Sequence, residues 1–412
     1  MTDNAIQRAE PPARKDPRPF KLMTLLVSVM VSAVYLRAGL TVLSGFIIEE
    51  FGISRSQFGW IFAAFAISGA IMSPLMGSVV DGSARRALLT VFVFATVGTL
   101  LAGLASGFVA LIAASGIAGV ALATGNPSTN RVITERIPMS IRGLATGVKQ
   151  SGAQLALLMA GVALPAIALV LNWRWALVSG IVVPVAGFLF VVRSAERDHV
   201  VVPRAERRSL TPAERHTVTW LAATSFFMAT ALASVQAFLP LYALEDVSMS
   251  ASAAGFMAAL LGLGGLVGRI LWTTIEYRFK SRVTLLVWIP IGAAATTGLI
   301  ASATPQTAWL LAVGAFGAGL LMLAWHAVAW LFVINASHHK SIGRSSSVMQ
   351  IGTFMGFGLG PVLTGYLVDA TGSYLVNWAV VILLFLLVSV LAIRLRHYLT
   401  AQLTEDHRSG RH

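Results

Sequence analysis

Apolar residues in this chain gather in long continuous stretches. Twelve stretches approach or exceed the roughly 20 residues that an α-helix needs to cross the hydrocarbon core of a bilayer. Short polar or glycine-bearing turns separate them, apart from one long charged break. The pattern therefore predicts an all-α membrane protein with twelve transmembrane helices, at 22–48, 57–80, 87–106, 109–130, 143–170, 174–192, 217–243, 252–275, 283–303, 307–332, 346–368 and 375–394.

The long break, 193–216, is charged and punctuated by prolines, and it divides the predicted helices into two sets of six. The two sets also resemble each other, because the stretch EEFGISRSQFGW after the first span aligns with LEDVSMSASAAGF after the seventh. Parallel six-helix repeats with a site between them are a known plan of transporters. We predict a cytosolic tail, a six-helix bundle, a cytosolic linker, a second six-helix bundle and a second cytosolic tail, at 1–21, 22–192, 193–216, 217–396 and 397–412.

Composition and charge support a membrane location. Of the 412 residues, 56% are hydrophobic and 11% are charged, against about 25% charged in soluble proteins. The net charge of +13 is one-sided: outside the predicted spans, the basic residues lie on the side of both termini, except Arg55 and Arg174. This distribution indicates cytosolic termini in a bacterial inner membrane and argues against nucleic-acid binding. With no cysteine, a disulfide or thiol metal site is excluded.

The loop after the second span, GSVVDGSARR, supplies a motif: Gly77, an acid at Asp81, and the basic pair Arg85 and Arg86. It resembles the signature loop of the major facilitator superfamily, in which the glycine permits close helix packing. The resemblance covers the whole chain and implies two six-helix bundles that rock about a central site. RGLATGVKQSGAQ is further similar to bacterial cyanate-permease-like and organic-anion permeases, although AWHAV (324–328) departs from their usual Trp-Asn-Gly.

Three basic residues fall inside predicted spans: Arg37, Lys149 and Arg269. A charge at the centre of a membrane helix costs about 2.5–3.5 kcal/mol on insertion scales, so such residues face protein or water and suggest function. All acidic residues map to tails, loops or span ends, so we expect the missing anion to be the substrate, held by the planar fork of Arg37. The alternatives are hydrogen bonds of Arg37 to backbone or hydroxyl oxygens and snorkelling of Lys149 or Arg269.

Uncharged polar residues in the spans are further substrate-binding candidates: Gln236, Gln154, Asn126, Tyr35 and His326. Helix–helix hydrogen bonding is the alternative role for such side chains. His326 is also the proton-coupling candidate, because the pKa of histidine lies near neutrality. The glycine run at 352–361 indicates close helix packing and not a phosphate loop.

These observations favour a secondary transporter of a small organic anion, a mono- or dicarboxylate, that works by alternating access with proton-coupled uptake. An anion exchanger or uniporter, a multidrug or metabolite exporter of the same superfamily, and a transport-like ligand sensor are the alternatives. We find no nucleophile–base pair, ATP-binding motif or metal-ligand spacing, so we expect no enzyme activity, no cofactor and no metal. A monomer in the lipid bilayer is expected.

Overall fold

The computed structural model describes residues 19–193, 212–275, 282–336 and 342–409. These residues form helices and turns and contain no strand. The predicted linker and both predicted tails lie partly outside the described residues, as does part of the region after the eighth span.

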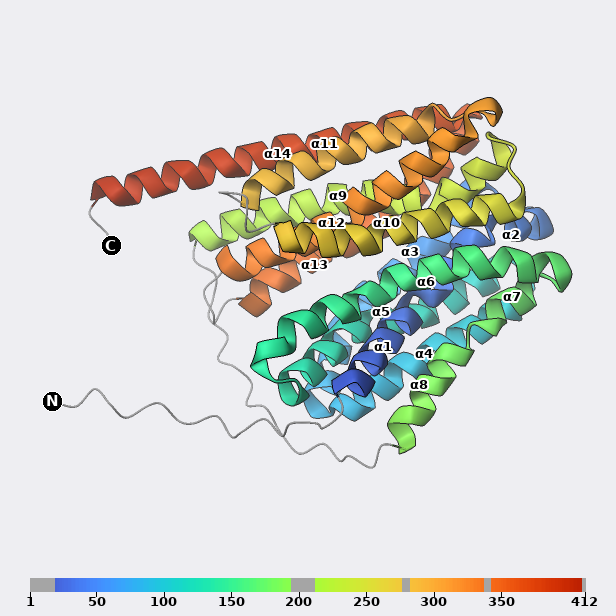
Figure 1. Ribbon diagram of the computed structural model, residues 1–412, viewed down its shortest axis with the longest axis horizontal. Coiled ribbons are helices and arrows are strands. Elements are labelled where there is room, and N and C mark those ends of the chain that lie inside the picture. Colours follow the sequence, from blue (N-terminus) through green and yellow to red (C-terminus); the bar gives the residue numbers. More distant parts are fainter. Residues whose placement is uncertain (1–18, 194–211, 276–281, 337–341, 410–412) are drawn as a thin grey trace.

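The N-terminal helices are α1 to α8 and the C-terminal helices are α9 to α14, and the two sets occupy opposite sides of the molecule (Figure 1). The N-terminal set has bounds α1 Pro19–Val42, α2 Ser44–Phe51, α3 Arg55–Gly82, α4 Ala84–Gly103, α5 Phe108–Arg136, η1 Met139–Ile141, α6 Arg142–Val170, α7 Trp173–Ser179 and α8 Val182–Arg193. The C-terminal set has bounds α9 Pro212–Glu245, α10 Ala251–Ile275, α11 Arg282–Ala301, η3 Pro305–Thr307, α12 Ala308–Ala336, α13 Ile342–Thr371 and α14 Tyr374–Ser409.

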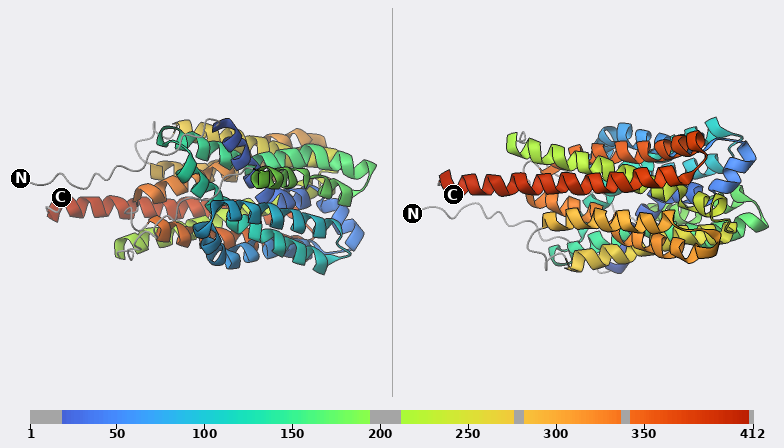
Figure 2. Two further views of the ribbon diagram at one scale, coloured as in Figure 1. Left: turned by 90° about the horizontal axis from the view of Figure 1, so that it is seen from below. Right: turned by 90° about the horizontal axis from the view of Figure 1, so that it is seen from above.

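Among the described residues, twelve helical spans are long and apolar enough to cross a membrane, and α7 and α8 together form one of them, which confirms the predicted fold class. Their long axes run roughly together, and α1 begins and α14 ends at the same end of the molecule, which we call the termini end (Figure 2). The opposite end, where α2 meets α3 and α9 meets α10, is the far end. The chain is a multi-pass membrane protein.

Two predicted spans are interrupted in the structure. The first is broken at Leu43, which separates α1 from α2. The sixth is divided into α7 and α8 around Gly180, where the ring of Tyr35 occupies the place of a side chain. A Cβ atom on Gly180 would lie 1.7 Å from Cζ of Tyr35, so the break lets α1 pack closely against this turn.

Two seams join the N-terminal and C-terminal helices: α3 packs on α13, and α6 packs on α10. Toward the far end both seams are tight, because a Cβ on Gly59 would lie 2.4 Å from the Pro361 carbonyl oxygen, and one on Gly161 would lie 2.4 Å from that of Gly255. Toward the termini end, a Cβ on Gly77 of α3 would meet nothing within 4 Å. The two sets of helices are therefore in backbone contact at the far end, and this contact is lost along α3 toward the termini end.

Candidate functional site

Arg37 lies on α1 and contacts the C-terminal helices. Its Nη2 donates a hydrogen bond to Oε1 of Gln236 on α9, at 2.9 Å. Its Cζ lies 4.7 Å from the centroid of the Phe357 ring on α13, within the range of a cation–π contact. Among the side chains that the structure describes, no carboxylate lies within 4.0 Å of this guanidinium. The charge of Arg37 is thus held between the two sets of helices by neutral groups.

His326 lies on α12 beside the same aromatic ring. The imidazole stacks on Phe357 with the ring centroids 6.0 Å apart and an interplanar angle of 29°. Trp325 meets it edge to face at 5.4 Å, and the Nε2 atom of His326 has no hydrogen-bond partner among the described residues. The structure therefore brings two predicted residues, Arg37 and His326, to Phe357, and a third, Gln236, to Arg37.

Lys149 on α6 is completely buried, and its partners lie on α5. The ammonium donates to Oδ1 of Asn126 at 3.3 Å, to Oγ1 of Thr129 at 3.0 Å and to Oδ1 of Asn130. Because an ammonium has three N–H donors, all of them are used within the N-terminal helices. In this conformation, no N–H donor of Lys149 is left for another partner.

Arg269 on α10 joins the network across the second seam. Its Nη1 donates to the carbonyl oxygen of Gln150 at 3.1 Å and to the Oε1 of the same residue at 3.2 Å. The Gln150 amide in turn donates to Asn126 at 3.0 Å. With its amide nitrogen turned toward the Gln150 carbonyl, Gln154 accepts from Nη2 of Arg269 at 3.3 Å. A continuous polar network therefore runs from Arg269 to the Asn126 that holds Lys149.

Tyr35 is not brought to this group. Its hydroxyl donates to the carbonyl oxygen of Leu177 at 3.2 Å, and the side chain is buried against α7. Its observed contacts hold α1 to α7.

The motif residues lie at the termini end. Asp81 and Arg86 are exposed, and Arg85 donates to the carbonyl oxygen of Val192 at 3.2 Å. The expectation that Gly77 permits close helix packing is not met in this conformation, because the space around it is open.

Ion pairs close the far end between the two sets of helices. Arg55, the first residue of α3, places Nε 2.9 Å from Oε2 of Glu245 at the end of α9. The backbone N–H groups of Arg55 and Ser56 donate to the carboxylate of Asp369 on α13, at 3.1 Å and 2.8 Å. The hydroxyl of Tyr374 donates to Glu245 at 2.7 Å. We call Arg55, Glu245 and Asp369 the far-end latch.

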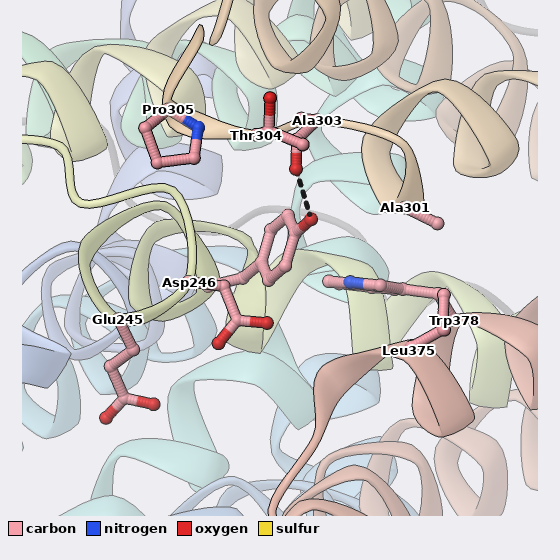
Figure 3. A pocket seen from close by; sticks show the side chains of 9 residues that line it. Glu245, Asp246, Ala301, Ala303, Thr304, Pro305, Leu375 and Trp378 are labelled. Carbon is pink, nitrogen blue, oxygen red and sulfur yellow. Dashed lines mark hydrogen bonds between the residues drawn. The ribbon is translucent and has the colours of Figure 1, made fainter. Parts of the chain in front are cut away.

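A cavity of about 460 Å³ lies beside this latch within the C-terminal helices (Figure 3). Glu245, Asp246, Tyr242 and Trp378 contribute to its wall, and the hydroxyl of Tyr242 donates to the Ala303 carbonyl oxygen at 3.1 Å. Burial and the neighbouring charge of Glu245 raise the pKa of Asp246. This end is therefore acidic, in contrast with the cationic groups between the two sets of helices.

The sequence reasoning missed Phe357, Gln150 and the latch. Phe357 lies within the glycine run, whose predicted close packing is confirmed: a Cβ on Gly356 would lie 2.3 Å from the Phe226 carbonyl oxygen of α9. The sequence signal that could have indicated Phe357 is the presence of an aromatic residue among these glycines. The aligned stretches EEFGISRSQFGW and LEDVSMSASAAGF contain Arg55 and Glu245, but the alignment indicates only a repeat and not a contact between them.

Several curated proteins are similar to this chain over most of their length. A D-galactonate transporter of Escherichia coli O6:H1 is 24% identical over 408 residues, covering 90% of this chain and 93% of the relative. A hexuronate transporter of Bacillus subtilis is 25% identical, covering 87% and 90%. A probable sulfoacetate transporter, SauU, of Cupriavidus necator is 27% identical, covering 82% and 84%.

Solved structures show the same fold. A bacterial homologue of the human lysosomal transporter Spinster, in an inward-facing and unoccupied conformation, has a TM-score of 0.67 at 18% identity and covers 92% of this chain and 96% of its own. The nucleoside transporter NupG has a TM-score of 0.72 at 16% identity and covers 91% and 99%. The family model of the Major Facilitator Superfamily matches residues 25–349. This chain belongs to the Major Facilitator Superfamily, a family of transporters and not of enzymes.

Proposed function

We propose that this protein is a secondary transporter of small organic anions and that Arg37 binds the anionic group of the substrate. The observation that carries the proposal is the position of Arg37: it lies on a membrane helix, between the two sets of helices, with no carboxylate partner among the described side chains. A charge in this environment requires a partner, and a guanidinium binds a carboxylate through two parallel hydrogen bonds. A monocarboxylate, a dicarboxylate or a sulfonate supplies the missing negative charge.

The relatives support this substrate class. D-galactonate, a hexuronate and sulfoacetate, the substrates in the names of three relatives, are all organic anions with a carboxylate or sulfonate group. The remaining cations, Lys149 and Arg269, support the same class because their fields attract an anion toward the second seam. Gln236 supplies a hydrogen-bonding group beside the anion, and Gln154 and Asn126 orient the two cations.

Transport follows from alternating access of the two sets of helices. We assign the termini end to the cytosol, because the basic residues lie on that side, and place the protein in a bacterial inner membrane as a monomer. Tight seams at the far end and open space around Gly77 then correspond to a state that faces the cytosol. Breaking the far-end latch and closing the termini end would produce the opposite state.

Proton-coupled uptake is the favoured mode, with His326 as the titrating group. His326 stacks on the ring of Phe357, which also contacts Arg37. Protonation of His326 and binding of an anion to Arg37 therefore affect the same group of side chains. In proteoliposomes with an imposed pH gradient, uptake of labelled D-galactonate, D-glucuronate or sulfoacetate should fall as external pH rises. Uptake that is independent of pH and requires internal anion would instead identify an exchanger, and downhill flux without either requirement a uniporter.

A melting-temperature screen of the purified protein tests the anion site. A ligand that binds only the folded state raises the melting temperature, by an amount that grows with ligand concentration over Kd. We expect at least one of D-galactonate, D-glucuronate and sulfoacetate to stabilise the protein, and we expect Arg37→Ala to abolish the effect. The matched control is Arg174→Ala, which removes an arginine at the far end and should leave the effect intact. Stabilisation by cationic compounds that survives Arg37→Ala would refute the proposal and favour an exporter.

A further inference from the structure

Phe357 occupies a fixed position between groups from two other helices. Arg37 of α1 lies against its ring, and His326 of α12 stacks on it. The backbone around it has little freedom, because a Cβ on Gly356 would lie 2.3 Å from a carbonyl oxygen of α9, and one on Gly360 would lie 2.2 Å from another. Close contact between α13 and α9 therefore holds the ring in place.

The contact between Phe357 and Arg37 uses none of the N–H donors of the guanidinium. A guanidinium has five N–H donors in one plane, and toward the residues that the structure describes Arg37 uses one of them, in its hydrogen bond to Gln236. The aromatic ring attracts the cation through its face, which restrains the guanidinium without occupying its N–H edges. Lys149 shows the contrasting case, in which neutral acceptors occupy every donor.

A restrained guanidinium with free edges is what a carboxylate or sulfonate needs for two parallel hydrogen bonds. Ordering a long side chain on binding costs about 0.5–1.5 kcal/mol, and a side chain that is ordered beforehand avoids that cost. We propose that Phe357 is a positioning residue, which holds the Arg37 guanidinium ready for the anionic group of the substrate and thereby sets substrate affinity. This inference rests on the proposed function of Arg37.

Substitutions at Phe357 test the proposal with a matched control on the same helix. Phe357→Leu removes the aromatic face, whereas Phe357→Tyr and Phe357→Trp keep one. Phe354→Leu makes the same chemical change one turn away, at a ring that lies 3.6 Å from the Cβ position of Gly69 on α3. With D-galactonate, D-glucuronate and sulfoacetate as probes, we expect Phe357→Leu to weaken binding about fivefold, as the strength of a partly buried cation–π contact implies.

The aromatic variants should bind within about twofold of the original protein, and Phe354→Leu should leave affinity unchanged. In proteoliposomes, Phe357→Leu should raise KM with little change in the maximal rate. An unchanged affinity in Phe357→Leu, or an equal loss in Phe357→Tyr and Phe357→Trp, would overturn the assignment. Such outcomes leave the anion site at Arg37 intact, so they are distinct from failure of the proposed function.

A second readout needs no substrate. Melting temperatures of the original protein, Phe357→Leu, Arg37→Met and the double variant form a thermodynamic cycle, in which residues in contact give non-additive effects. We expect the double variant to lose less than the sum of the two single losses. Additive losses would refute the contact between Phe357 and Arg37, whether or not any of the three probes binds. Failure of all three probes to bind would by itself refute only the proposed function.

Discussion

Removal of the Arg55 side-chain charge should shift this protein toward a state that is open at the far end. Arg55 pairs with Glu245 at 2.9 Å and with Asp369 at 3.9 Å, and both acids lie on C-terminal helices. Arg55→Gln removes these two ion pairs but keeps the backbone N–H of residue 55 that donates to Asp369. The change therefore weakens the latch without removing the carboxylate that caps α3.

The exposure of the side chains determines how much free energy the two ion pairs of Arg55 contribute. The Arg55 side chain is 37% exposed, and those of Glu245 and Asp369 are 26% and 25% exposed. Partly exposed ion pairs contribute about 0.2–1 kcal/mol each, and the longer pair contributes less than the shorter one. A total near 1 kcal/mol changes the ratio of the two conformations about fivefold.

Distance measurements between spin labels would detect this shift. The chain contains no cysteine, so Ser106→Cys and Ser302→Cys place one label on the exposed α4–α5 turn and one on the α11–η3 turn of the far end. We expect Arg55→Gln to increase the population with the longer distance. The control is Arg174→Gln, which removes an ion pair to Glu50 within the N-terminal helices at the same end. An unchanged distance distribution in Arg55→Gln, or an equal shift in Arg174→Gln, would refute the latch.

Three further changes should alter the melting temperature in detergent. Gly180→Ala should lower the melting temperature, because the new Cβ would lie 1.7 Å from the Tyr35 ring and overpacking costs about 1–3 kcal/mol of stability; an unchanged melting temperature would mean that the turn adjusts without cost. Asp246→Asn should raise it at neutral pH, because burial and the charge of Glu245 raise the pKa of Asp246 and so disfavour its ionised form in the folded protein. The gain should shrink as the pH falls and vanish well below about 3.9, the ordinary pKa of aspartate, because the carboxyl is then protonated in both the folded and the unfolded protein; a gain that persists there would contradict the electrostatic reason. Lys149→Met should lower the melting temperature, because each buried acceptor left unsatisfied costs about 1–3 kcal/mol of stability. A higher melting temperature would mean that burying the charge costs more free energy than its hydrogen bonds contribute.

The amino-acid sequence alone determined the helices of this protein and the residues that lipid does not tolerate. A membrane span is a local property, because every backbone group must be satisfied within the helix and the side chains must be apolar over about 20 residues. The sequence therefore predicts the twelve helices and the presence of a charged residue, Arg37, inside the first of them. The interruption at Gly180 was not, because it depends on the distant ring of Tyr35.

Which groups meet depends on how the helices pack. Nothing local relates Arg37 to Phe357, or Arg55 to Glu245, because each pair comes from helices far apart in the chain that pack across a seam. The tertiary structure also distinguishes two cations that the sequence places alike inside membrane spans: acceptors on α5 occupy the donors of Lys149, whereas Arg37 meets one amide and an aromatic face. The physical reason is that hydropathy depends on each residue and the lipid around it, whereas a partner depends on the packing of whole helices.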